Sequence, residues 1–277
     1  MKYKVLSLLT VLAMAAFAEP KLPRTPRLYV FDCGQIAGLD PNIFGFEKSQ
    51  LAEVDFVVTC YLFAHPNGLL MWDTGTVPDS AFKSDGKPVK DGISTVAKPL
   101  APQLAALGYK PEDVKYLAMS HYHSDHTANA NLFAGATWIV QKAERDAMFA
   151  EKPASIMKPE SYNKLKDAKA LILNNDKFDV FGDGSAVIYS APGHTPGHQV
   201  LMVKLPKSGA ILLAGDLYHY PEERPAKKTP TFEFNREQSL KSREAVDKLL
   251  ADSKAQMWIG HDKPTFTKGK KAPDFYE

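Results

Sequence analysis

The chain has 277 residues, of which 44% are hydrophobic and 24% are charged, and this composition is ordinary for a folded globular protein. It excludes an intrinsically disordered chain, a collagen-like protein and a coiled coil. The 34 basic and 32 acidic side chains nearly balance, so the sequence offers no bulk electrostatic attraction to nucleic acid or to an anionic membrane.

The N-terminal segment has the pattern of a secretory signal peptide. Lys2 and Lys4 give a positive start, a mostly apolar run follows, and Ala16-Phe17-Ala18 has the small-x-small form of a cleavage site. The apolar run is shorter than the roughly 20 residues of a membrane-spanning helix, so an uncleaved anchor is the less favoured alternative. We expect residues 1–18 to be a signal peptide and residues 19–277 to be a single mature domain, periplasmic or secreted and without a membrane anchor.

Cys33 and Cys60 are the only cysteines, and each lies in or beside a predicted strand. An exported protein can form and keep a disulfide, so a bridge between neighbouring strands is one expectation. Two buried free thiols are the alternative, because free cysteine is commonly buried. Metal ligation is disfavoured, since neither cysteine is near the histidine cluster described below.

Short β-branched and aromatic runs predict strands, and apolar residues at helical spacing predict helices. Strands are expected at residues 27–33, 56–63, 69–72, 114–119, 137–140, 179–181, 186–189, 199–204, 211–216 and 256–259. Helices are expected at residues 93–107, 142–149 and 237–250, with a short one at 131–133. Strands and helices alternate in two successive halves, which predicts an α/β fold with helices outside packed sheets.

Predictions can also be made for four segments that connect these strands and helices. Residues 65–68 contain Asn-Gly and predict a tight hairpin turn. Residues 40–53 are irregular and are a candidate flap over a site. Residues 79–92 predict a polar loop, and residues 153–169 predict an insertion near the site.

Three of the eight histidines, and one carboxylate, lie within residues 121–126, directly after a predicted buried strand. His121 and His123 can turn toward one point, while Asp125 and His126 can face a second point beside it. Imidazole nitrogen and carboxylate oxygen are the ligands that a divalent metal such as zinc prefers. Polar loops without a function rarely concentrate these residue types, so the cluster indicates a metal site.

Three further candidate ligands follow other predicted strands. His194 lies in a turn fixed by prolines and glycines, Asp216 ends the strand at 211–216, and His261 follows the last strand. Catalytic groups on loops held by a rigid sheet are the usual arrangement. Seven ligands are too many for one zinc ion and fit two ions that share a carboxylate.

Two more polar residues lie at strand ends. His198 begins a strand and is interpreted as a structural residue or as a partner of a ligand, rather than as a ligand itself. Asp73 follows the strand at 69–72, and it is either a hydrogen-bond partner of a ligand histidine or a turn former.

The motif His121-Tyr122-His123-Ser124-Asp125-His126, together with His194, Asp216 and His261, resembles that of the metallo-β-lactamase-fold hydrolases. The resemblance covers nearly all of the chain after residue 18. It implies an α/β fold of the αβ/βα type, with two central mixed sheets, outer helices and a two-metal site at one edge. It also implies that His121, His123 and His194 hold one Zn²⁺ (or another divalent transition metal), that Asp125, His126 and His261 hold a second, and that Asp216 bridges both.

Within this superfamily the chain is most similar to the N-acyl-homoserine lactonases. The matching segments are residues 60–62, 72–75, 192–199 and 260–262, and residues 215–219 and 232–238 resemble exported members. In these enzymes a tyrosine three residues after the bridging aspartate usually faces the substrate, and this chain has His219 there. Tyr218 and Tyr220 flank that position and are our catalytic candidates.

The resemblance implies a zinc-dependent lactonase that opens N-acyl homoserine lactones and so degrades a quorum signal. Two metals about 3.5–4 Å apart lower the pKa of a shared water, and the bridging hydroxide attacks the lactone carbonyl. Asp125 can pass a proton to the leaving alkoxide, and Tyr218 or Tyr220 can assist the oxyanion. Phe44 and Phe46, with the two tyrosines, are candidates to bed an acyl chain, although ordinary core packing explains them equally well.

Two alternatives stay open. A β-lactamase-like or arylester/phosphotriester hydrolase of the same superfamily would use the same metals. A non-catalytic metal-binding protein is the alternative from another class, and a redox member would need a flavin domain for which the chain has no room. The partner we expect is a small lactone, with no nucleic acid, and the sequence does not indicate an oligomeric state.

Overall fold

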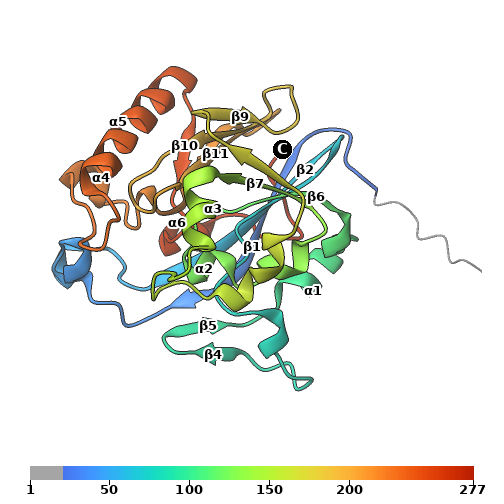
Figure 1. Ribbon diagram of the computed structural model, residues 1–277, viewed down its shortest axis with the longest axis horizontal. Coiled ribbons are helices and arrows are strands. Elements are labelled where there is room, and N and C mark those ends of the chain that lie inside the picture. The colour runs from blue at the N-terminus through green and yellow to red at the C-terminus, as the bar shows by residue number, and fades with distance from the viewer. Residues whose placement is uncertain (1–20) are drawn as a thin grey trace, which may run out of the picture.

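The computed structural model describes residues 21–277, so the predicted signal peptide at residues 1–18 lies outside the described part. Two mixed β-sheets pack face to face and carry helices on their outer faces (Figure 1). This is the predicted αβ/βα sandwich. Within residues 21–277, no helix is long and apolar enough to cross a membrane.

The first sheet has eight strands in the order β4-β5-β1-β2-β3-β6-β7-β8. Their bounds are β1 Arg27–Ile36, β2 Phe56–His65, β3 Gly68–Trp72, β4 Val89–Asp91, β5 Ser94–Val96, β6 Val114–Ala118, β7 Thr137–Gln141 and β8 Ala170–Leu173. β2 and β3 form the predicted hairpin, and β3, β6, β7 and β8 run parallel.

The second sheet has five strands in the order β13-β12-β11-β10-β9. Their bounds are β9 Lys177–Asp179, β10 Ala186–Ser190, β11 Gln199–Leu205, β12 Gly209–Leu213 and β13 Gln256–Trp258. Only the β12–β13 pair is parallel among these strands, so both sheets are mixed.

Side-chain alternation along the strands builds three cores. In β1, Leu28 and Val30 belong to the core between the sheets, while Tyr29 and Phe31 belong to the core on the outer face. This follows from the two-residue period of a strand, which sends neighbouring side chains to opposite faces. The third core lies between the second sheet and a helix on its outer face. β2 is buried along its whole length, and burial on both faces explains why its sequence is largely apolar.

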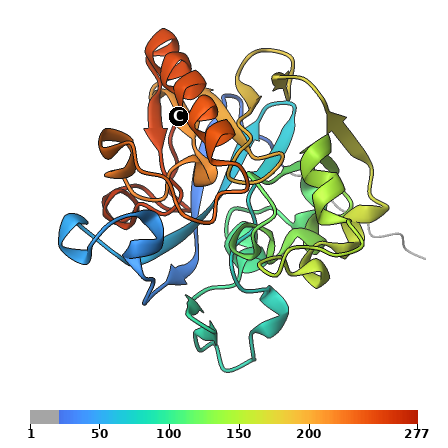
Figure 2. The same cartoon turned by 60° about the vertical axis from the view of Figure 1, so that its left-hand side comes forward.

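Three of the helices, α1, α3 and α5, pack on the outer faces of the sheets (Figure 2). The bounds of the helices are α1 Leu100–Ala105, α2 Ser124–Thr127, α3 Lys142–Met148, α4 Glu223–Ala226, α5 Arg236–Ser253 and α6 Lys263–Lys268. α5 covers the second sheet through Val246 and Leu250. It begins after Asn235, whose side chain accepts a hydrogen bond from Gln238 N–H at 3.1 Å. The helix predicted at 237–250 is thus confirmed and is longer than expected.

Two predictions for residues 79–107 were wrong. The expected loop at 79–92 contains β4, which pairs with β5 in a hairpin that projects from the body (Figure 1). The expected helix at 93–107 is only α1, because the chain is extended through β5 and Pro99. Proline is tolerated in the first turn of a helix but not in its interior, so Pro102 requires a helix that begins shortly before it.

Cys33 and Cys60 form a disulfide between the neighbouring antiparallel strands β1 and β2, with their Cα atoms 5.9 Å apart. The alternative of two free thiols is therefore excluded. The bridge lies in the outer core of the first sheet, and Cys33 packs against the Gly75 turn that follows β3.

Candidate metal centre

The metal centre is built where strands of both sheets end. The segment after β6 carries His121, His123, Asp125 and His126, and the turn between β10 and β11 carries His194. Asp216 lies in the short turn after β12, and His261 follows β13. The loops of the two sheets thus meet at one edge of the sandwich.

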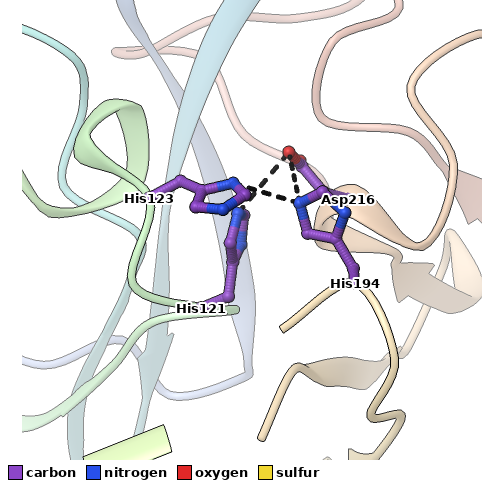
Figure 3. Close-up of side chains that lie close together, drawn as sticks. All are labelled: His121, His123, His194 and Asp216. Carbon is purple, nitrogen blue, oxygen red and sulfur yellow. Dashed lines mark hydrogen bonds and ion pairs between the residues drawn. The ribbon is translucent and has the colours of Figure 1, made fainter. Parts of the chain in front are cut away.

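The seven predicted ligands form two groups that share one residue. The first contains His121, His123, His194 and Asp216, and Figure 3 shows these side chains pointing toward one another. The second contains Asp125, His126, Asp216 and His261. In each group the ligand atoms lie within 4.8 Å of one another.

The two oxygens of Asp216 divide between the groups. Oδ2 lies 3.6 Å from His121 Nε2 and 3.5 Å from His194 Nε2. Oδ1 lies 3.2 Å from His126 Nε2 and 3.1 Å from His261 Nε2. A carboxylate with one oxygen toward each group has the geometry of a bridging ligand.

The residues fit two divalent metals. Nitrogen and oxygen atoms around a tetrahedral zinc ion lie about 3.3 Å apart, close to the separations at Asp216. His121 Nε2, His126 Nε2 and Asp216 Oδ1 are buried and have no hydrogen-bond partner among the described residues. Buried polar atoms rarely stay unpaired, and a cation would satisfy all three.

Burial, together with repulsion between neighbouring imidazoles, keeps His121 and His123 of the first group in the neutral form that binds metal. Burial, with the neighbouring imidazoles, holds the pKa values of His121 and His123 well below the usual histidine range. Burial alone would raise the pKa of Asp216, but the imidazoles of His261 and His126 hold that pKa well below its usual range. Neutral imidazole and ionised carboxylate are the forms that bind metal.

Asp73 and His198 form hydrogen bonds with residues of the metal centre. For each of them, this was one of the two roles that the sequence allowed. Asp73 accepts a hydrogen bond from Ser120 N–H at 2.6 Å, and its Oδ2 lies 3.0 Å from His126 Nδ1. His198 Nε2 accepts a hydrogen bond from Asp216 N–H at 3.1 Å. Asp73 also has a φ of 57°, so it forms the sharp turn as well.

Sequence analysis missed Glu144 of α3, which joins the two histidine loops. Its carboxylate accepts hydrogen bonds from Tyr122 N–H at 2.7 Å, from Gly197 N–H at 2.8 Å and from the Thr195 hydroxyl at 2.8 Å. Burial nevertheless raises the pKa of Glu144 to about 7. No local sequence signal could have identified it, because all three donors are distant in sequence.

The structure places Tyr218 and Tyr220 outside the two ligand groups and outside the pocket above them. The Tyr218 ring packs in the core under α5, and the Tyr220 hydroxyl donates to the Val54 carbonyl at 2.8 Å. His219 lies at the site instead, with Nε2 3.3 Å from Asp216 Oδ2 and Nδ1 3.3 Å from Glu223 Oε1.

A pocket of about 300 Å³ opens over the metal centre. Its polar floor contains His123, Ser124, Asp125, Asp216, His219 and His261. Its walls are largely apolar and contain Ile36, Leu39, Ile43, Phe44, Phe56, Ile93, Ile156 and Phe232. Phe44 therefore lies at the pocket as expected. Phe46 packs against Tyr220 instead and is not part of the wall.

The family model of the metallo-beta-lactamase superfamily matches residues 54–255. N-acyl homoserine lactonase AttM of Azorhizobium caulinodans is 31% identical over 264 residues, which cover 91% of this chain and 98% of the relative. N-acyl homoserine lactonase of a Bacillus species is 31% identical over 221 residues, covering 76% of this chain and 82% of the relative.

Solved structures share the fold. N-acyl homoserine lactone hydrolase with the product N-hexanoyl-L-homoserine at its catalytic metal centre superposes with a TM-score of 0.76 at 23% identity, covering 91% of this chain and 99% of that one. AidC, a dizinc quorum-quenching lactonase, gives a TM-score of 0.65 at 20% identity, covering 94% and 97%. The chain belongs to the metallo-beta-lactamase superfamily and, within it, to the N-acyl homoserine lactonase family.

Proposed function

We propose that the protein is a two-metal hydrolase that opens the ring of N-acyl homoserine lactones. The observation that carries this proposal is the pair of ligand groups sharing Asp216 at the floor of an apolar pocket. The kinship with N-acyl homoserine lactonases supports the same substrate class. A polar lactone head would lie on the floor, and its acyl chain along the apolar walls.

The seven ligand residues keep their predicted roles in this proposal. His121, His123 and His194 would hold one divalent metal, Asp125, His126 and His261 would hold the other, and Asp216 would be shared by both. When bound, the metals supply a water of lowered pKa and polarise the lactone carbonyl.

The remaining chemistry belongs to side chains of the pocket. Asp125, with 17% of its side chain exposed, is the ligand carboxylate at the pocket surface and can carry a proton to the leaving alkoxide. His219, rather than a tyrosine, is the residue that can hydrogen-bond a carbonyl oxygen of the substrate, because it lines the pocket and its Nε2 lies 3.3 Å from Asp216 Oδ2. Glu223 orients this ring by accepting hydrogen bonds from the backbone N–H of His219 and of Tyr220, at 3.0 and 3.2 Å.

A substrate panel tests the reaction. We expect the highest kcat/KM on acyl homoserine lactones, compared with a simple γ-lactone, an arylester, a carbapenem and a phosphotriester. Efficient turnover of the β-lactam or phosphotriester, with poor turnover of every lactone, would refute the lactonase proposal and leave a two-metal hydrolase. No turnover of any substrate by protein with bound metal would favour a non-catalytic metal-binding protein.

Replacing the shared ligand tests the two-metal site. We expect Asp216→Ala to lose metal from both groups and nearly all lactonase activity, because each group loses one ligand and the two lose their connection. Elemental analysis of the purified variant measures the metal, and turnover of an acyl homoserine lactone measures the activity. Near-normal turnover would contradict the bridging role.

We also propose that the mature protein is exported to the periplasm or the medium. The supporting observations are the signal-peptide pattern of residues 1–18 and the Cys33–Cys60 disulfide, since disulfides persist in oxidising compartments. N-terminal sequencing of the periplasmic or secreted fraction should give a chain that starts after Ala18. Full-length protein confined to the cytosol would contradict export.

A further inference from the structure

A buried carboxylate, Glu233, lies behind His194 with no hydrogen-bond partner among the described residues. Its side chain is 1% exposed, and its Oε1 lies 3.7 Å from His194 Nδ1. Neither oxygen of Glu233, nor His194 Nδ1, makes a hydrogen bond within residues 21–277. Burying an unpaired carboxylate is unfavourable, so the position of Glu233 indicates a partner or a function.

The backbone holds Glu233 beside the loop that carries His194. Phe234 N–H donates to the carbonyl of His194 at 3.2 Å, and Asn235 N–H donates to the carbonyl of Gly193 at 2.8 Å. Because these bonds begin at the residue directly after Glu233, the carboxylate cannot move far from the imidazole. The contact is therefore built into the fold.

Three of the other four ligand imidazoles show what His194 lacks; the fourth, His123, presents its Nδ1 to the site, 3.1 Å from His194 Nε2. His121 Nδ1 lies 3.0 Å from Ser120 Oγ, His126 Nδ1 lies 3.0 Å from Asp73 Oδ2, and His261 Nδ1–H donates to the Val57 carbonyl at 2.8 Å. Each of these rings faces Asp216 through Nε2, as His194 does. An imidazole that binds metal through Nε2 carries its proton on Nδ1, where it needs an acceptor. At His194 the group in that place is Glu233.

We propose that Glu233 is a positioning residue for His194. When the first metal binds Nε2, the Nδ1–H of His194 donates to the Glu233 carboxylate, and the ring is fixed with Nε2 toward the metal. The separation of 3.7 Å is longer than a hydrogen bond. The proposed hydrogen bond therefore requires the two groups to move closer together when metal binds. The inference rests on the proposed two-metal site, and it names a residue that sets metal affinity without touching the metal.

Zinc affinity of the purified mature chain, measured by competition with a chromophoric chelator, tests the inference. Glu233→Ala removes the acceptor, and Glu233→Gln keeps an amide oxygen that can still accept. The matched control is Glu237→Gln, four residues later on the exposed face of α5, where Glu237 forms an ion pair with Lys241. Urea unfolding of each metal-free protein shows whether a change in affinity comes from lost stability.

We expect Glu233→Ala to weaken binding of the first zinc by about 10- to 100-fold. Glu233→Gln should lose less, and the control should bind as the wild type does. Metal-free Glu233→Ala should unfold at the same urea concentration as the wild type or a higher one, because the removed carboxylate had no partner.

Two results would overturn the inference. One is wild-type zinc affinity in Glu233→Ala. The other is weaker binding in Glu233→Ala and Glu233→Gln alike, with an equal loss of stability in the metal-free proteins. If the wild-type chain itself bound no zinc, the two-metal proposal would fall as well. If the wild type bound zinc and opened lactones while Glu233→Ala bound zinc equally well, only the role of Glu233 would fall.

Discussion

His219 connects the metal centre with the substrate pocket. Its Nε2 lies 3.3 Å from the bridging carboxylate, and its ring forms part of the pocket floor. We expect His219→Ala to lower kcat/KM for an acyl homoserine lactone by roughly 100-fold, the usual effect of removing one transition-state hydrogen bond. The zinc content should not change, because His219 belongs to neither ligand group.

Tyr218 provides the control for this prediction. Its ring lies in the core, and burial raises the pKa of its hydroxyl to about 12. Tyr218→Phe removes only that hydroxyl and should leave kcat/KM unchanged. A large loss in Tyr218→Phe with little effect of His219→Ala would return the catalytic role to the tyrosine.

His198 gives the protein a specific sensitivity to acid. Burial lowers its pKa to about 3, whereas an unfolded histidine titrates near 6.5. Between these values the unfolded chain binds more protons than the folded one, so the stability that neutral His198 contributes is present above about pH 6.5 and is lost as the pH falls toward 3. The loss is about 1.4 kcal/mol per pH unit in this range.

Urea unfolding of metal-free protein measures this effect. Between pH 7 and pH 5, the wild type should lose roughly 2 kcal/mol more than His198→Gln, which does not titrate. Using the metal-free protein removes the pH dependence of metal binding, and the protonation of the other histidines contributes equally to both proteins. Equal losses in both proteins would show that His198 titrates normally in the folded state.

The structure brings the seven predicted ligands together, but among the residues next to Asp216 it places His219, and not the predicted tyrosines, at the pocket. The ligands His121 to His126, His194 and His261 follow strands, and a strand end limits where the next side chains can lie. The neighbours of Asp216 lie in a tight turn, in which a shift of one residue changes the direction of a side chain completely. The turn directs His219 to the pocket and Tyr218 to the core, and the local sequence does not determine that choice.

At the scale of elements, the turn between β10 and β11 packs tightly on the start of α5. Gly193 has a φ of +137°, and a Cβ there would lie 2.2 Å from the backbone nitrogen of Ser239. We expect Gly193→Ala to lower the free energy of unfolding by about 3 kcal/mol, through backbone strain and overpacking, and to displace His194. Urea unfolding and lactone turnover measure the two effects.

Gly184 is a matched control, because its φ is +77° but a Cβ there would meet no atom within 4 Å. Gly184→Ala should cost only about 1–2 kcal/mol from the left-handed backbone, with activity retained. If the two variants lost the same free energy of unfolding and the same activity, the close packing of Gly193 on α5 would not explain why this turn has a glycine.

The same scale explains which elements could be predicted. Buried strands such as β2 and β3 have dense apolar sequences that only a covered sheet explains. The β4–β5 hairpin is short and mostly exposed, so its sequence resembles that of a loop. The helix expected at 93–107 had suitable apolar spacing, but Pro99 and Pro102 decided where α1 could begin.

At the scale of the molecule, the metals join the two halves of the chain. His121, His123, Asp125 and His126 follow a strand of the first sheet, whereas His194, Asp216 and His261 follow strands of the second. Metal that binds only the folded state stabilises it by about 4 kcal/mol when its concentration is 1,000 times its dissociation constant. Removing zinc with EDTA should therefore lower Tm by on the order of 10 °C, and added zinc should restore it.

Scanning calorimetry checks this prediction, and Asp216→Ala is its control. That variant should melt at the same temperature with and without zinc. A wild-type Tm that did not respond to EDTA or to zinc would show that the metals do not stabilise the folded chain.

The pocket walls and the metal ligands come from different kinds of segment, and this difference has an evolutionary consequence. The ligands follow directly from sheet strands, but Leu39, Ile93, Ile156 and Phe232 come from segments distant from one another in the sequence. Ile93 and Ile156 are about half exposed, so replacing them costs little stability. Selection can therefore change which acyl chains fit while the reactive centre stays fixed, and closely related chains can diverge in the signals that they degrade.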